Sequence, residues 1–464
     1  MSVWERLGFR ENLYATPPLP GNEEGSRLLV GRDEEVEELQ DHWASYDTHA
    51  SIEGSNGVGK TSLVAVAAYR DMVEREQARK PLIIPLNEIF QLTSESAGFE
   101  NRVYLALARA MLDNERRLAR AGYPLSDLGG LRQWIDSPTN TTKAVSGSAF
   151  GFGGGGTYGV ASSTSPGFTE GGLVELVNSN LRNIFPSRAA GGFVGILDNM
   201  ELLSTSKDAR KRLEEMRDGV LSIPGVRWVL CGANGIVRSA VGSPRLTGRV
   251  ADPIRLQPLK PADVPEVIQR RITQYGGNTY LHGQDSKFLD PPVDPTGFLH
   301  LYRVLNNNLR IALKHAGEFT KWFDKNALRD YKRNQESLDY AFSRGRREFD
   351  RVLRERSAER YRYLEVWLTE QADQYALDAG ALTERTWRLF DDMIIIGGSC
   401  SPSEYEQFGF TSREAMRPYV KALEDANLVN SAVDEDDSRR RTIEITPNGW
   451  LVHYKRSGYK EPGA

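Results

Sequence analysis

The chain has 464 residues, 39% of them hydrophobic and 26% charged, which leaves room for roughly two to four domains of ordinary globular composition. With 59 basic and 63 acidic residues the formal net charge is −4, which excludes a strongly polybasic nucleic-acid binder but not a local basic face. The chain has only two cysteines, which excludes a disulfide framework and suits a reducing compartment. Its start lacks the apolar core of a signal peptide, and no apolar run is long enough to span a membrane, so we expect a cytoplasmic protein.

The first half of the chain alternates short apolar runs with amphipathic segments. Residues 1–30, rich in proline and glycine, are expected to form an extended arm, and an acidic helix carrying Val36, Leu39 and Trp43 follows. Strands are predicted at 50–53, 81–87, 191–199 and 226–234, and helices at 61–76, 100–121 and 205–220. This alternation predicts an α/β domain with a parallel, doubly wound sheet over residues 31–256.

A cluster of the chain's 43 glycines lies at residues 146–172. Such a segment cannot bury enough side-chain surface to offset the entropy lost on ordering. We therefore expect a flexible insertion in the sheet domain, the alternative being a loop that closes on a partner.

Strand signals stop after about residue 256. Helices are predicted at 261–275, 297–325 and 336–377, which gives a helical segment over 257–330 and a charged helical connector over 331–383. From 384 to 464 the pattern predicts three helices and then a β-hairpin over 429–453. That order is the outline of a winged-helix domain.

A glycine-rich motif between the first strand and the next helix carries the strongest chemical signal. It matches G-x-x-x-x-G-K-[ST], in which backbone amides and a helix N-terminus surround phosphates. Lys60 supplies a charge to the β- and γ-phosphates and Thr61 a hydroxyl for Mg²⁺, whereas a chance glycine-rich turn needs no strand before it or helix after it. The residues expected to hold ATP are Gly54, Ser55, Asn56, Gly57, Val58, Gly59, Lys60, Thr61 and Ser62.

A phosphate-binding loop predicts an acidic residue on a neighbouring strand, because Mg²⁺ must also be held from the other side. The apolar run at 193–197 ends in Asp198. Thr61 and Asp198 are therefore the predicted metal-binding residues. The alternative for Asp198 is a helix N-cap at the end of a strand.

These motifs resemble those of the AAA+ ATPases, nearest to the branch with origin-recognition-type and STAND-like NTPases. Gly31 and Arg32 resemble the Val-Gly-Arg segment that packs near adenine, Asn234 resembles the sensor-1 residue, and Arg310 the sensor-2 arginine that reaches the γ-phosphate from a helical lid. The resemblance covers residues 28–325. It implies a P-loop AAA+ core, an all-α lid over 257–330, and the cofactors ATP and Mg²⁺. The alternatives are a strand-end turn for Asn234 and a surface position for Arg310.

The resemblance also implies an arginine that acts on the nucleotide of an adjacent subunit, and hence a homo-oligomer. Arg245 and Arg249 follow the sensor-1 strand, and Arg249 is the better placed. An ordinary loop arginine is the alternative.

The position after Asp198 departs from the family pattern, which has a glutamate that polarises the attacking water. Here it is Asn199, and an amide cannot accept a proton as a general base. Either Glu201 takes that role, or Asn199 only orients the water, or hydrolysis is slow and the protein acts as an ATP-loaded switch. We favour slow hydrolysis.

The C-terminal domain carries basic residues that suit DNA. Arg413, Arg417 and Lys421 share one helix face, and Arg439, Arg440 and Arg441 lie on the hairpin. Against this, four acidic residues at 434–437 precede those arginines, and Pro418 should kink the helix or displace its start. DNA contact and protein docking therefore both remain open.

The sequence as a whole predicts an ATPase that couples nucleotide state to lid closure and oligomerisation, acting with DNA in replication initiation, transposition or mobile-element defence. The alternative is a nucleotide-gated STAND-type signalling or scaffold protein whose winged helix docks a protein client. No membrane partner is expected.

Overall fold

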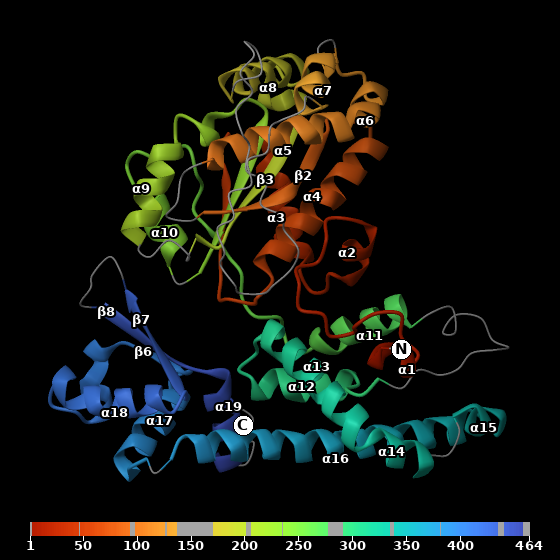
Figure 1. Ribbon diagram of the computed structural model, residues 1–464, viewed down its shortest axis with the longest axis vertical. Helices are drawn as coiled ribbons and strands as arrows, with labels where there is room; N and C mark the ends of the chain where they lie inside the picture. The colour runs from red at the N-terminus through yellow and green to blue at the C-terminus, as the bar shows by residue number, and fades with distance from the viewer. Residues whose placement is uncertain are drawn as a thin grey trace.

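The computed structural model places the chain in three regions, an upper α/β region, a helical region below it and a small C-terminal region beside the latter (Figure 1). The described residues are 2–45, 47–92, 98–125, 128–136, 170–200, 206–233, 235–276, 291–334, 338–380, 382–434 and 440–457. Most of the predicted glycine-rich insertion lies outside them, but residues 170–172 begin helix α8 (Glu170–Ile184). Within the described part, every helix is too short or too polar to cross a membrane.

The upper region is built on a five-stranded parallel sheet, as the sequence predicts. The strand order is β2-β3-β4-β1-β5, and all the pairings are parallel. The strands are β1 (Ala50–Glu53), β2 (Ile83–Gln91), β3 (Gly192–Asp198), β4 (Val226–Gly232) and β5 (Ile254–Arg255). Every residue of β3 and β4 is buried, which matches their continuous apolar sequences.

Helices cover both faces of this sheet, which confirms the doubly wound prediction. Alternate residues of β3 serve opposite faces: Val194 packs with α3 and α4, and Phe193 with α5 and α8. The helices of this region are α3 (Asp33–Ser45), α4 (Lys60–Gln77), α5 (Phe99–Asp113), α6 (Glu115–Arg120), α7 (Leu128–Asp136), α8, α9 (Ser206–Met216) and α10 (Ile236–Val241). The helix predicted at 100–121 is thus two helices, which meet at Asn114.

The N-terminal segment is not the extended arm that its composition predicts. It contains two short helices, α1 (Val3–Arg6) and α2 (Glu23–Leu28). Between them Phe9, Leu13 and Tyr14 are buried in the core of the helical region. The Tyr14 hydroxyl donates to the carbonyl oxygen of Val293 at 2.6 Å, so the segment is fixed to the helices rather than free.

The helical region follows the sheet, but the helix predicted at 297–325 is broken. The chain turns at residues 305–308, where Asn306 and Asn307 have positive φ angles of 52° and 57°. Asparagine tolerates this left-handed conformation better than most residues, which explains the break. The helices are α11 (Val264–Tyr275), α12 (Pro295–Val304), α13 (Leu309–Asn326), α14 (Leu328–Asn334), α15 (Leu338–Ser343) and α16 (Arg346–Asp378).

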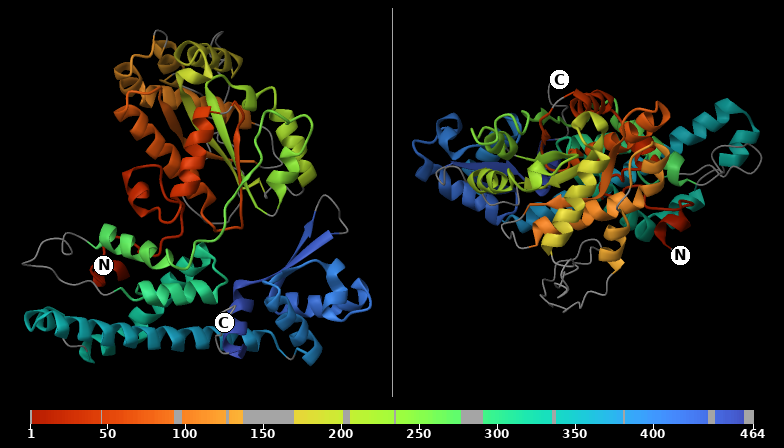
Figure 2. Two further views of the ribbon diagram at one scale, coloured as in Figure 1. Left: turned by 180° about the vertical axis from the view of Figure 1, so that it is seen from behind. Right: turned by 90° about the horizontal axis from the view of Figure 1, so that it is seen from above.

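Long helix α16 runs beneath the helical region and leads to the C-terminal region (Figure 2). There the elements are α17 (Glu384–Ile395), β6 (Ser399–Cys400), η5 (Pro402–Phe408), α18 (Arg413–Asp425), β7 (Val429–Asp434), β8 (Arg440–Ile445) and α19 (Pro447–Ser457). The strands form an antiparallel sheet in the order β6-β8-β7.

Two predictions for the C-terminal region need correction. The hairpin ends at Ile445 rather than at residue 453, because the Thr446 hydroxyl accepts from the Gly449 amide and Pro447 begins helix α19. Helix α18 starts at Arg413, capped by Ser412, and continues through Pro418. Its start is therefore not displaced by the proline.

Candidate nucleotide-binding site

The glycine-rich loop lies where parallel sheets place their ligand sites, at the carboxyl end of a strand. Strand β1 ends at Glu53, and helix α4 begins at Lys60. Gly57 and Gly59 have φ angles of +82° and +104°, a backbone conformation that favours glycine. Because Gly59 caps α4 without a side chain, the first amides of the helix face the loop and suit an anion.

The lysine and the two predicted metal-binding residues are buried at this point. The Lys60 ammonium donates to the carbonyl oxygens of Gly54 and Ser55, at 2.8 and 3.3 Å. The Thr61 hydroxyl donates to Asp198 Oδ2 at 2.6 Å, which brings together two residues that are far apart in the sequence.

The donor set at this point fits Mg²⁺. Among the described residues Asp198 Oδ1 is buried and has no hydrogen-bond partner, a situation that costs about 1–3 kcal/mol unless a ligand satisfies the atom. Carboxylate and hydroxyl oxygens are the hard ligands that Mg²⁺ prefers. No group of three or more His, Cys, Asp or Glu side chains suited to a metal occurs in the described ranges. Phosphate and water oxygens would therefore complete the shell.

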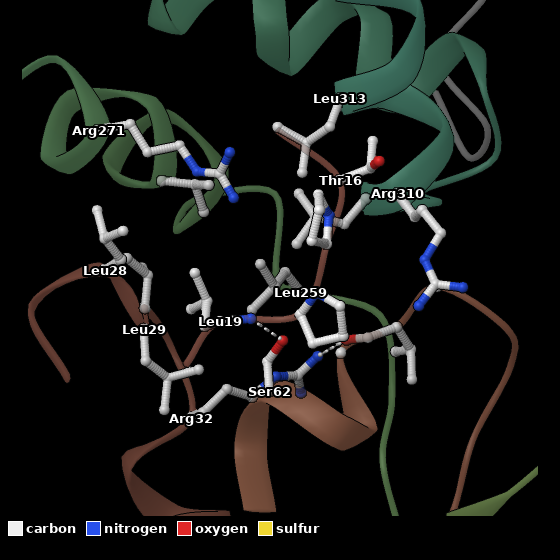
Figure 3. A pocket seen from close by; sticks show the side chains of 18 residues that line it. Thr16, Leu19, Leu28, Leu29, Arg32, Ser62, Leu259, Arg271, Arg310 and Leu313 are labelled. Atoms are coloured by element: carbon white, nitrogen blue, oxygen red, sulfur yellow. Dashed lines mark hydrogen bonds between the residues drawn. The ribbon is translucent and has the colours of Figure 1, made fainter. Parts of the chain in front are cut away.

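Beside the loop lies a pocket to which three parts of the chain contribute (Figure 3). Thr16 and Leu19 line it from the N-terminal segment, Arg271 and Arg310 from the lid helices α11 and α13, and Ser62 from α4. Its lining residues are Thr16, Pro17, Pro18, Leu19, Leu28, Leu29, Val30, Arg32, Gly57, Val58, Gly59, Ser62, Leu259, Val267, Arg271, Leu309, Arg310 and Leu313. The mixture of apolar walls and a few cations suits a base and its phosphates.

Arg32 is buried in the floor of this pocket and supports the loop. Its guanidinium donates to the carbonyl oxygens of Val58 at 3.3 Å and of Gln257 at 2.7 Å, and it pairs with Glu35. It therefore joins the loop to the segment that leads into the lid. Gly31 has a φ angle of +63°, and an added Cβ there would lie 2.7 Å from the Asp263 carboxylate.

The lid touches the loop directly through the N-terminus of α13. The Asn308 side chain caps this helix by accepting from the Ile311 amide, and its amide group donates to the Asn56 carbonyl oxygen at 3.0 Å. A Cβ added at Gly57 would lie 2.8 Å from Arg310 Cβ, so only glycine allows this approach. The exposed Arg310 guanidinium lies at the edge of the pocket.

Arg249 is not part of this pocket. Its carbonyl oxygen accepts from the His49 amide at the start of β1, and the four residues of β1 span about 13 Å at about 3.3 Å per residue. Arg249 thus lies at the end of the sheet where β1 begins, whereas the phosphate-binding loop follows the other end of that strand. Arg245 pairs with Glu214 at 3.3 Å.

The expected water-activating residues are only partly described. Asn199 follows β3 with a φ angle of +54°, a conformation that asparagine accepts more readily than glutamate. Glu201 and Asn234 lie outside the described residues.

Several pocket residues escaped the sequence-based prediction. Buried Arg271 donates to the carbonyl oxygens of Leu13 and Ala15, both at 2.9 Å, and its burial lowers the pKa of its guanidinium. Leu19 donates its amide to the Ser62 hydroxyl at 2.9 Å. The N-terminal segment therefore forms one wall of the pocket, whereas its proline- and glycine-rich composition predicted only an extended arm.

The predicted basic face of α18 exists but is mixed in charge. Arg413, Arg417 and Lys421 are exposed and line one surface hollow together with Glu414, Glu424 and Asp425. The two nearby arginines contribute to lowering the pKa of Glu414, after the hydrogen bonds from its own backbone and from Ser412. Arg439 lies outside the described residues, and Arg440 and Arg441 belong to β8, paired with β7.

Comparisons with known proteins find distant similarity to solved structures. No family model and no curated protein matches the chain. Among solved structures it is similar to the ORC2 protein of Aeropyrum pernix in its ADP form, with 13% identity, 97% and 98% of the two chains covered and a TM-score of 0.41. The ORC1 protein of Aeropyrum pernix in complex with DNA is 14% identical, with 97% of each chain covered and a TM-score of 0.38. The Walker-type ATPase paby2304 of Pyrococcus abyssi is 15% identical, with 95% of this chain and 99% of that one covered and a TM-score of 0.40.

Likeness at such identities and TM-scores does not assign a function to this chain. The function proposed below therefore depends on the site itself.

Proposed function

We propose that the chain is an ATPase of the AAA+ type, which binds ATP and Mg²⁺ between the sheet domain and a helical lid. The observation that carries the proposal is the contact between Thr61 and Asp198 beside a loop that also touches the lid through Asn308. Thr61 and Asp198 suit a metal ion bound to phosphates. The hydrogen bond from Asn308 to Asn56 joins the lid to the loop, so phosphates bound in the loop can change the position of the lid. No other described region combines these features.

The described side chains suggest a division of roles. Lys60 exchanges the carbonyl oxygens of Gly54 and Ser55 for phosphate oxygens, while the first amides of α4 hold the same group. When bound through Thr61 and Asp198, Mg²⁺ neutralises charge on the phosphates. Arg310 approaches the γ-phosphate from the lid. Asn199 and Asn234 orient the attacking water, Glu201 being the alternative that activates it, and turnover is slow.

We divide the chain into a segment at 1–30, a nucleotide-binding domain at 31–256, a lid at 257–330, a connector at 331–383 and a winged-helix domain at 384–464. The segment at 1–30 works with the lid, because its Leu13 and Ala15 carbonyl oxygens bind Arg271 of α11. Lid closure would therefore also act on the pocket wall formed by residues 16–19, which Leu19 joins to Ser62 of α4.

Arg249 can act on a nucleotide only in a neighbouring subunit, because it lies at the start of β1 and the loop of its own subunit lies at the end of that strand. We propose that ATP promotes a homo-oligomer in which Arg249 reaches a neighbouring γ-phosphate. Light scattering with a non-hydrolysable ATP analogue tests this. A monomer at all concentrations would contradict it.

The client is proposed as DNA, in replication initiation, transposition or mobile-element defence. The exposed residues Arg413, Arg417 and Lys421 support it. The second candidate is a signalling or scaffold protein whose C-terminal domain docks a protein, and the acidic residues in the same hollow favour it.

One experiment separates these functions. ATP turnover is measured with and without duplex DNA at two salt concentrations, and with EDTA in place of Mg²⁺. The ATPase proposal predicts Mg²⁺-dependent turnover, and the DNA proposal predicts stimulation and binding that weaken as salt rises. Turnover without any effect of DNA would leave the protein-docking alternative.

A further inference from the structure

Glu53 is a buried carboxylate directly before the phosphate-binding loop. It is the last residue of β1 and only 8% exposed. In the sheet Glu53 pairs with Gly232 of β4, and Leu230 of β4 pairs with Leu197 of β3. Continuing this register places Glu53 level with Asn199, on the face of the sheet opposite to Asp198.

The hydrogen bonds of Glu53 leave one oxygen without a partner. Oε2 accepts from the Arg238 guanidinium at 3.3 Å, whereas Oε1 is buried and has no partner among the described residues. The Arg238 side chain is 52% exposed, so solvent screens the pair and it adds little stability. That gain does not offset the cost of an unsatisfied buried polar atom. Packing and pairing therefore do not account for a carboxylate at this position.

We infer that Glu53 is the carboxylate that activates water in ATP hydrolysis, and this inference rests on the proposed function. Residue 199, which carries the acid in the AAA+ pattern, is an asparagine in a left-handed conformation. The nearest described carboxylate at the same level of the sheet is on β1, two strands away, with β4 between them. Glu53, directly before the phosphate-binding loop, takes the place of the acid that residue 199 lacks.

The step assigned to Glu53 is a proton transfer. The water oxygen forms a bond to the γ-phosphorus while the bond from that phosphorus to the bridging oxygen breaks. The electron pair of the broken bond leaves with ADP, and the proton of the water passes to Glu53 Oε1. Arg238 is a positioning residue, because it holds Oε2 and leaves Oε1 for the water.

The test compares ATP affinity with turnover in the full-length chain. Glu53→Gln keeps the shape of the side chain but cannot accept the proton, so single-turnover hydrolysis should fall by about 100-fold or more while the Kd for Mg·ATP stays within about threefold. Asp71→Asn is the matched control, because Asp71 is also a buried carboxylate, paired with Arg75 on α4 away from the loop. The control should keep its hydrolysis rate.

The outcomes distinguish this inference from the proposed function. A wild-type chain that binds no ATP would contradict the proposed function. Wild-type binding without any hydrolysis would contradict the ATPase proposal as well as the role of Glu53. Normal binding and hydrolysis in Glu53→Gln, with a wild type that hydrolyses ATP, would overturn the role of Glu53 alone. If Glu53→Gln does not fold, Glu53→Asp retains the charge but shortens the reach. It should bind ATP normally and hydrolyse it more slowly, and an unchanged rate would overturn the inference.

Discussion

The nucleotide pocket and the basic face of α18 present charge in different ways. At the phosphate loop and the pocket beside it the charged groups other than the exposed Arg310 are buried and held by fixed partners, as in the Thr61–Asp198 bond and the three hydrogen bonds of Arg32. On α18 the basic side chains are exposed, and carboxylates line the same hollow. Buried, partnered groups lose much when one is changed, whereas exposed charges act weakly and additively. The pocket should therefore respond sharply to single substitutions and α18 only gradually.

The largest effect is expected at Thr61 and Asp198, the proposed metal-binding pair. Asp198→Asn keeps the size of the side chain but removes its charge, and metal stabilisation of the transition state is worth several kcal/mol, or about 100-fold or more in rate. We expect Mg²⁺-dependent turnover to fall by about that factor. Steady-state ATPase assays over a Mg²⁺ titration measure it. An unchanged Mg²⁺ dependence would show that Asp198 is not a metal ligand.

A somewhat smaller effect is expected where loop and lid meet. Gly57→Ala places a Cβ 2.7 Å from Asn308 Oδ1 and requires a φ angle of +82° from an L-residue. The strain of about 1–2 kcal/mol should weaken ATP binding by about tenfold. Gly242→Ala is the control, because its φ angle is negative and its nearest neighbour is 3.4 Å from the added Cβ. Equal affinities in the two variants would mean that lid and loop do not meet in solution.

Low pH should reduce the stability of the sheet domain through protonation of His49. Its Nδ1 accepts from the Trp228 amide and its Nε2 donates to the Leu221 carbonyl oxygen. Burial lowers the pKa of His49 to about 4, although the bond to Leu221 acts in the opposite direction. The unfolded state, with a histidine pKa of about 6.5, binds the proton more readily, so stability is lost as the pH falls from about 6.5 to about 4. The loss reaches about 3 kcal/mol at most.

Denaturant unfolding at several pH values, followed by tryptophan fluorescence, measures this loss. The variant His49→Gln lacks the titrating group and should show a weaker pH dependence of the free energy of unfolding. The same slope in both proteins would rule out His49 as its origin.

The smallest single effects are expected on α18. If DNA binds there, Arg417→Ala should weaken binding modestly and lower the salt dependence of log K by about 0.9, the value for one phosphate contact. Glu424→Gln, in the same hollow, should strengthen binding. Fluorescence anisotropy with a labelled duplex measures both. No change in the salt slope for either variant would place DNA elsewhere or exclude it.

Local sequence signals predicted much of the sheet domain. Strands β3 and β4 are short apolar runs, and the glycine-rich motif marks the loop, the end of β1 and the start of α4, so their positions need no knowledge of the rest of the chain. The closeness of Asp198 to Thr61 also follows, because parallel strands end at one edge of the sheet.

Features set by distant contacts could not be predicted in this way. Helix α8 begins Glu-Gly-Gly, a poor helix former, and its helical structure depends on the packing of Leu173, Val177 and Leu181 in the core. The pocket wall at residues 16–19 depends on contacts with Ser62, and that segment is held by the hydrogen bonds of Arg271 to Leu13 and Ala15. The unpaired oxygen of Glu53 becomes visible only when the side chains around it are placed.

The central claim is that the loop at 54–61 binds ATP. Titration of the full-length wild-type chain and the variant Lys60→Ala with a fluorescent ATP analogue and Mg²⁺ tests it most directly, with Lys211→Ala, on the exposed surface of α9, as the control. We expect saturable binding by the wild type and the control, and a loss of about 100-fold or more in Lys60→Ala, equivalent to about 2.7 kcal/mol. Equal affinity in all three proteins would contradict the claim.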